Sequence, residues 1–111
     1  MGFLSFMGNS KTISPEMALQ IMEEHPDHVL LDVRNPDEFA WAYIEGATLL
    51  PINLLTSEAS TKLPDKEAYI LVYCHTGYRS AQAVKMLGKM GYNNVYDIGG
   101  IIEWPYDIVS G

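Results

Sequence analysis

The sequence predicts an α/β fold with a parallel sheet of about five strands and helices on both of its faces. Short apolar runs such as residues 29–33 and 69–73 are typical of strands that are covered on both faces. Segments with apolar residues at helical spacing lie between such runs, as at residues 79–91. Strands that alternate with helices form parallel sheets, and sites in such sheets lie beyond the carboxyl ends of the strands.

The first half of the chain is expected to begin with a helix. Ser14, Pro15 and Glu16 have the residue types of an N-cap, a first-turn proline and a first-turn acid, and the apolar helical face continues to His25. A strand, a short helix capped by Asn35 and a second brief strand follow, at residues 29–33, 36–42 and 47–50.

The second half begins with a mixed stretch, residues 53–66, which predicts only short helical turns and loop. The strand at residues 69–73 is the strongest in the chain, and it leads directly into Cys74. Gly77 supplies the turn before the amphipathic helix expected at about residues 79–91. The chain closes with a strand and a short helix, at residues 94–98 and 101–104.

The composition fits one domain over residues 1–111, with residues 1–10 as a loosely ordered N-terminus. The chain is 48% hydrophobic and 19% charged, as soluble globular proteins are. Its formal net charge of −7 disfavours nucleic acid and anionic membranes as partners, and requires a local positive charge for any anionic substrate. No run approaches the roughly 18 apolar residues of a membrane span, so no membrane association is expected.

Cys74 is the single cysteine, and no Cys/His cluster has the spacing of metal ligands. We therefore expect no disulfide, no metal and no other cofactor. A lone thiol fits a reducing compartment, and the N-terminus lacks the basic segment of a signal peptide. A periplasmic or organellar protein whose leader has been removed would show the same features. The expected protein is a cytoplasmic monomer.

The position of Cys74 favours a reactive thiol. A cysteine between a buried strand and the start of a helix meets unpaired backbone N–H groups and the positive end of the helix dipole, which stabilise its thiolate. Arg79 adds a fixed positive charge, and His75 can add more. A lone cysteine after a strand is also often a small buried hydrophobe. The combination of nucleophile, Gly77 and Arg79 at one junction is hard to explain by packing alone.

The loop resembles the active-site loop of single-domain rhodanese-like sulfurtransferases, whose pattern is Cys-x-x-Gly-x-Arg-Ser. Cys74, Gly77, Arg79 and Ser80 match every fixed position. Further matches occur in the same order as in the family, at residues 31–34 with 38–39, 44–47 with 51, and 99–100 with 104. The resemblance covers most of the chain, from about residue 14 to residue 104.

The resemblance implies a thiosulfate:acceptor sulfurtransferase that works by double displacement. Cys74 takes a sulfane sulfur from a donor such as thiosulfate and passes it to cyanide, a thiol or a protein. Arg79 lies near the donor oxygens, and Ser80 is either a hydroxyl near the persulfide or a helix-cap partner. The expected substrate-binding residues are those of the loop: His75, Thr76, Gly77, Tyr78, Arg79 and Ser80.

Other polar and aromatic residues are expected to support the fold. Asp32 and Arg34 match an Asp-x-Arg pattern and are interpreted as buried groups that fix loops by hydrogen bonds, with a role in substrate entry as the alternative. Glu38 is a candidate partner for either arginine. Trp41 and Trp104 are expected in the core.

One position departs from the family, and two other functions stay open. Many members have a histidine where this chain has Tyr43, and we expect the tyrosine to pack in its place. One alternative function is a non-catalytic docking or regulatory module, although such modules usually lose the cysteine. The other is a phosphatase or arsenate reductase of the same fold, whose loop is one residue longer than the four residues between Cys74 and Arg79.

Overall fold

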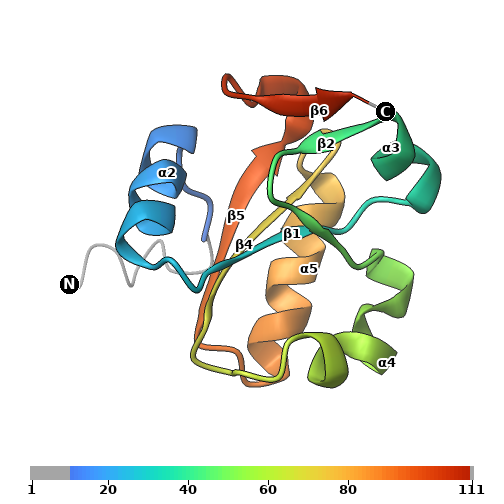
Figure 1. Ribbon diagram of the computed structural model, residues 1–111. Helices are drawn as coiled ribbons and strands as arrows, with labels where there is room; N and C mark the ends of the chain where they lie inside the picture. Colours follow the sequence, from blue (N-terminus) through green and yellow to red (C-terminus); the bar gives the residue numbers. More distant parts are fainter. Residues whose placement is uncertain (1–10, 111) are drawn as a thin grey trace.

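The computed structural model describes residues 11–110, so the expectation for the first ten residues lies outside the described part. Its main sheet is parallel, with strands in the order β3-β1-β4-β5 (Figure 1). The strands are β1 (Val29–Asp32), β3 (Thr48–Leu49), β4 (Tyr69–Cys74) and β5 (Asn94–Gly100). Thr12 adds one isolated parallel bridge to Asp97. The predicted α/β class is confirmed, and this sheet has four strands in the described residues.

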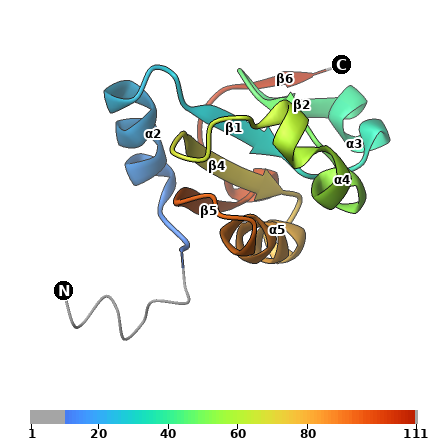
Figure 2. The same ribbon diagram turned by 90° about the horizontal axis from the view of Figure 1, so that it is seen from below.

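Helices cover both faces of the sheet, as expected. The helices are α2 (Pro15–Glu24), α3 (Pro36–Trp41), α4 (Ile52–Lys62) and α5 (Tyr78–Lys89). α2 lies on one face and α4 and α5 on the other (Figures 1 and 2). Side chains of β4 alternate accordingly, because successive residues of a strand point to opposite faces. Ile70 and Val72 pack in the core under α4 and α5, while Leu71 and Tyr73 pack in the core that includes Ala18 of α2.

The ends of α2 follow the sequence. The Ser14 hydroxyl accepts the N–H of Met17 at 3.1 Å, and the helix starts at Pro15. This satisfies one of the free N–H groups at the helix start.

None of the helices within residues 11–110 has the length and apolar character needed to span a membrane.

α4 is longer than its sequence suggests. Short turns and loop were expected there, but residues 52–62 form one continuous helix. Its amphipathic pattern is weak, and tertiary contacts hold it: Leu55 and Ala59, four residues apart, are both fully buried. The Tyr92 hydroxyl also lies 2.6 Å from the carbonyl oxygen of Leu63 at the end of this helix. The stability of α4 therefore comes from tertiary packing more than from the helix propensity of its own residues.

A second, two-stranded antiparallel sheet was not predicted. This sheet pairs β2 (Ala42–Ile44) with β6 (Ile108–Ser110). The 3₁₀ helix η1 (Ile101–Glu103) lies between β5 and β6 in the chain. Trp104 packs, partly buried, against the core on the α2 side, as expected. The expectation for Trp41 is wrong, because its side chain is 82% exposed. Trp41 ends α3, whose six residues bury no side chain fully, so the ring has no core within reach.

Candidate active site

Cys74 is the last residue of the central strand β4, and α5 begins four residues later at Tyr78. The site therefore lies beyond the carboxyl end of a parallel strand, as predicted. The segment between them, with the first turn of α5, is called the Cys74 loop here and comprises residues 74–80. Gly77 adopts a φ of +112°, a left-handed conformation that favours glycine and allows the chain to turn into the helix.

The loop places its backbone amides around the sulfur atom. Cys74 Sγ is nearly buried, with the residue 1% exposed. It accepts the N–H of Gly77 at 3.0 Å and that of Ser80 at 3.3 Å. These amides belong to the start of α5, where N–H groups have no partner inside the helix. Such donors stabilise negative charge on sulfur without a separate acid or base.

Ser80 lies beneath the sulfur and is held by a residue that the sequence reasoning missed. The hydroxyl is 3.5 Å from Cys74 Sγ and donates to Asp97 Oδ1 at 2.8 Å. Asp97 Oδ1 also accepts the N–H of Gly99 at 2.8 Å. Asp97 is buried in β5, and a carboxylate between Tyr96 and Ile98 in the predicted strand was the available signal. Ser80 is thus both close to the sulfur and part of a buried polar network.

Gly100 supports the loop from β5. A Cβ on this residue would overlap the carbonyl oxygen of His75 and lie 2.6 Å from Thr76 Cα. Glycine is required here because two backbones approach closely. The structure supports the expectation that backbone geometry explains this glycine pair, since Gly99 also has a positive φ of +89°.

Arg79 is bound by Glu38 of α3. Its two terminal nitrogens donate to the two carboxylate oxygens at 2.8 and 2.9 Å. The hydrogen bonds from Arg79 lower the pKa of Glu38 to about 2, and the same contact raises the pKa of Arg79. Glu38 Oε1 also accepts the N–H of Asn35 at the start of α3. Of the two candidate arginines, Glu38 therefore binds Arg79, and this bidentate pair fixes the position of the guanidinium.

Asp32 and Arg34 form a second, buried pair. Arg34 Nη2 lies 2.8 Å from Asp32 Oδ2 and donates to the carbonyl oxygen of Ala42 at 2.6 Å. Burial opposes the charged guanidinium, but the hydrogen bond and charge of Asp32 raise the pKa of Arg34 overall. Nearby, burial raises the pKa of Tyr73, whose hydroxyl oxygen accepts the N–H of Ile44. Through Arg34 and Tyr73, these contacts hold both ends of β2 near the ends of β1 and β4.

The remaining predicted residues lie on the outer side of the loop. His75, Thr76 and Tyr78 are exposed, so their side chains do not surround the sulfur. Tyr43, which stands where many members have histidine, stacks on Phe39 with ring centroids 4.3 Å apart. Within the described part of the chain, no three His, Cys, Asp or Glu side chains are grouped so that they could hold a metal ion.

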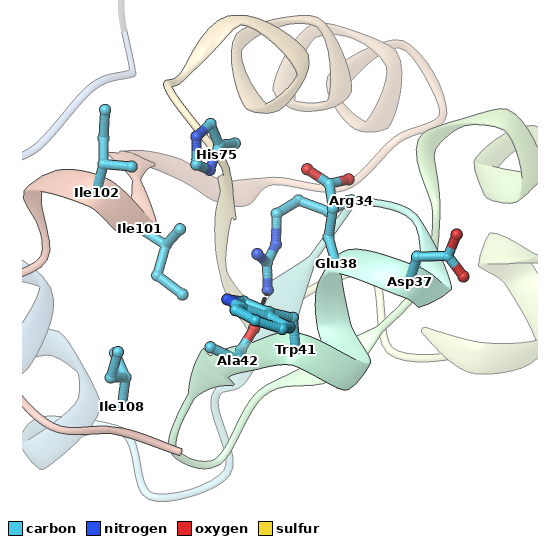
Figure 3. A pocket seen from close by; sticks show the side chains of 9 residues that line it. All are labelled: Arg34, Asp37, Glu38, Trp41, Ala42, His75, Ile101, Ile102 and Ile108. Carbon is cyan, nitrogen blue, oxygen red and sulfur yellow. Dashed lines mark hydrogen bonds between the residues drawn. The ribbon is translucent and has the colours of Figure 1, made fainter. Parts of the chain in front are cut away.

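A pocket of about 500 Å³ opens beside the loop (Figure 3). It is called the Trp41 pocket here, and its lining comes from α3, β2, β6, η1 and the residues after β1 and β4. The lining residues are Arg34, Asp37, Glu38, Trp41, Ala42, His75, Ile101, Ile102 and Ile108. Sequence reasoning did not predict this pocket, because η1 and the small sheet come together only in the folded chain.

The chain belongs to the family described as the rhodanese-like domain, whose model matches residues 14–105. It is 35% identical over 81 residues to the thiosulfate sulfurtransferase PspE of Escherichia coli, covering 73% of this chain and 78% of that protein. It is 36% identical over 97 residues to the thiosulfate sulfurtransferase GlpE of Pseudomonas entomophila, covering 87% and 85%. Such relatives support a sulfurtransferase of the rhodanese type.

Comparison with solved structures gives the same family. A solved structure titled rhodanese with anions, from E. coli, matches with a TM-score of 0.71 and 32% identity, over 76% of this chain and 99% of that one. Some relatives are much longer: the chain spans 24% of one named as a probable adenylyltransferase and sulfurtransferase, from Mycobacterium tuberculosis. The rhodanese-like domain thus occurs both nearly alone and within larger proteins.

Proposed function

We propose that the protein is a thiosulfate:acceptor sulfurtransferase in which Cys74 carries the sulfur as a persulfide. The observation that carries the proposal is the position of Cys74 Sγ, which accepts two backbone N–H groups at the start of α5. Amide donors suit both states of such an enzyme, the thiolate and the terminal sulfur anion of the persulfide. The names of two relatives, PspE and GlpE, support thiosulfate as the donor.

In the first half-reaction, the Cys74 thiolate attacks the outer sulfur of thiosulfate. A bond forms between Sγ and that sulfur, the sulfur–sulfur bond of thiosulfate breaks, and sulfite leaves with the electron pair. Arg79 is the proposed cation for the donor oxygens. Its pair with Glu38 uses two of the five guanidinium N–H donors, so the others are available to an anion.

In the second half-reaction, a thiophilic acceptor attacks the outer sulfur of the persulfide. With cyanide, a carbon–sulfur bond forms, the bond between the two sulfurs breaks, and Cys74 returns to the thiolate as thiocyanate leaves. A thiol or a protein-borne thiol can accept the sulfur in the same way. The cytoplasmic location and the monomeric state expected from the sequence remain parts of this proposal.

The alternatives receive less support. The non-catalytic module does not need the Cys74, Gly77 and Arg79 set that this chain has. The phosphatase or arsenate reductase hypothesis requires a loop with five residues between the cysteine and the arginine. This chain has four residues between Cys74 and Arg79. The names of PspE and GlpE favour neither alternative.

The test is the intact mass of the purified protein after incubation with thiosulfate, followed by cyanide. We expect a gain of one sulfur atom that cyanide removes, and no gain in Cys74→Ser. Arg79, Ser80 and the amides remain in that variant, so it isolates the thiol. A protein that gains no sulfur from thiosulfate, or a Cys74→Ser variant that gains it equally, would contradict the proposal.

A further inference from the structure

The Trp41 pocket has an apolar wall that the chemistry of Cys74 does not use. Trp41 is 82% exposed, Ile102 60% and Ile108 47%, and all three line the pocket. Soluble domains rarely gather large exposed apolar side chains in one place unless the surface binds something. The volume of about 500 Å³ lies within the usual range of small-molecule sites.

The pocket is continuous with the Cys74 loop. His75 directly follows Cys74 and lines the pocket, and its carbonyl oxygen accepts the N–H of Ile102 at 3.4 Å. Glu38 lines the pocket while it holds Arg79 of the loop. A molecule bound in this pocket therefore lies next to the loop that holds the sulfur.

Figure 3 shows how the side chains are arranged around the pocket. Ile101, Ile102 and Ile108 stand on one side and Trp41 on the other, with His75 and Arg34 between them. Apolar side chains therefore line two opposite sides of the pocket.

The charges of the lining favour an uncharged occupant. Among the described lining residues the one arginine is Arg34, which is already bound to Asp32 and to the carbonyl oxygen of Ala42. Glu38 is bound to Arg79, and Asp37 adds an exposed carboxylate. The described lining thus offers an anionic group no arginine or lysine that is free of a carboxylate, and His75 is its one other basic side chain. An anionic group would also be repelled by a chain of net charge −7.

We propose that the Trp41 pocket binds the sulfur acceptor, and that this acceptor is a small uncharged thiol with an apolar body. The inference rests on the proposed persulfide of Cys74. The acceptor loses its thiol proton, its sulfur attacks the outer persulfide sulfur, and the bond to Cys74 Sγ breaks with the electron pair on Sγ. The products are the Cys74 thiolate and the acceptor persulfide, which takes up one proton, so no oxidant or reductant is needed.

The experiment measures how fast different acceptors discharge the persulfide. The full chain is loaded with thiosulfate, freed of excess donor, and mixed with 1-propanethiol, 1-butanethiol, 1-pentanethiol or 1-hexanethiol, and separately with cyanide. These thiols share nearly the same acidity, so the comparison reports binding. We expect the second-order rate constant, followed by intact mass, to rise about twofold to fourfold per methylene. The ω-mercaptocarboxylate of matching length is expected to react more slowly than 1-hexanethiol.

Two variants test whether the preference for longer thiols arises in the Trp41 pocket. Trp41→Ser is expected to lower the ratio of the 1-hexanethiol rate to the cyanide rate by about tenfold, because the apolar wall is lost. Met17→Ser is the matched control, since Met17 is an exposed apolar residue of α2 that does not line the pocket, and it should keep the ratio.

Two outcomes separate the inference from the proposed function. Rates that do not change with chain length, while cyanide discharges the persulfide normally, would overturn the acceptor pocket and leave the proposed function standing. An equal loss of both rates in Trp41→Ser would also overturn it. Failure to form a persulfide at all would overturn the proposed function together with this inference.

Discussion

The two arginine–carboxylate pairs near the Cys74 loop have the same chemistry and different surroundings. The side chains of Arg34 and Asp32 are 4% and 0% exposed, whereas those of Arg79 and Glu38 are 27% and 30% exposed. The first pair joins residues two apart in sequence, and the second joins residues 41 apart, from α3 to the start of α5.

The difference in burial assigns the two pairs different roles. A buried charge without a partner is very costly, so Asp32 is required wherever Arg34 is present. A half-exposed pair contributes little stability, so the main effect of the Arg79–Glu38 pair is to fix the position of the guanidinium. The buried Arg34–Asp32 pair connects β1 to β2, whereas the Arg79–Glu38 pair holds a cation at the edge of the Cys74 loop.

The largest effect is expected from breaking the buried pair. Asp32→Ala leaves the Arg34 guanidinium buried without its carboxylate, and should lower the free energy of unfolding by about 3–5 kcal/mol. Urea unfolding followed by tryptophan fluorescence measures this change. Asp32→Asn, which keeps the shape and one acceptor, should lose less. A loss below about 1 kcal/mol in Asp32→Ala would mean that this pair behaves like a surface pair.

The next effect concerns catalysis more than stability. If Arg79 binds the donor oxygens as proposed, Arg79→Ala should lower kcat/KM for thiosulfate roughly tenfold or more, because a charge-assisted hydrogen bond is lost. The free energy of unfolding should fall by no more than about 1 kcal/mol. Steady-state kinetics and urea unfolding measure the two quantities, with Arg79→Lys as the variant that keeps the charge. Similar losses in both quantities would instead assign Arg79 a structural role.

The smallest effect is the pH dependence of the half-exposed pair. Arg79 lowers the pKa of Glu38 from 4.5 to about 2, so the pair's stabilisation is complete above pH 4.5 and is lost as the pH falls toward 2. Glu38→Gln should therefore be less stable than the parent protein by up to about 1 kcal/mol at pH 7. That difference should vanish between pH 4.5 and 2, which unfolding curves across this range measure.

A matched surface variant serves as control for this prediction. Glu58 pairs with Lys62 across one turn of α4 at 3.4 Å, and both side chains are exposed. Glu58→Gln should change the unfolding free energy by only about 0.3–0.5 kcal/mol. If Glu38→Gln shows the same small change, and no loss of it toward pH 2, the Arg79–Glu38 pair has no special strength.

Local sequence was sufficient for the central parts of the fold. Ser14 with Pro15 predicted the start of α2, and the run of β4 predicted a buried strand that ends at Cys74. Such features depend on residues that are neighbours in the chain, through capping, proline geometry and apolar periodicity. The Cys74 loop was predictable for the same reason, because its cysteine, turn glycine and arginine lie within six consecutive residues, 74–79.

Only the tertiary structure decided which distant residues meet. Asp97 binds Ser80 because β5 pairs with β4, with a register shift between Val72 and Tyr73. Glu38 could have joined either arginine, and the packing of α3 against the loop selected Arg79. These pairings depend on how strands and helices pack across long stretches of sequence, which local patterns do not record.

The Trp41 pocket is the clearest case of this division. The sequence alone determined the family motif and the strand that ends at Cys74. It placed Trp41 in the core, since aromatic residues usually bury their rings. In the folded chain α3 is short and lies at the edge, while η1 and β6 bring three isoleucines to face it. Whether an apolar side chain is buried depends on what packs against it. Trp41 stays 82% exposed, and the isoleucines that share its pocket come from about sixty residues further along the chain.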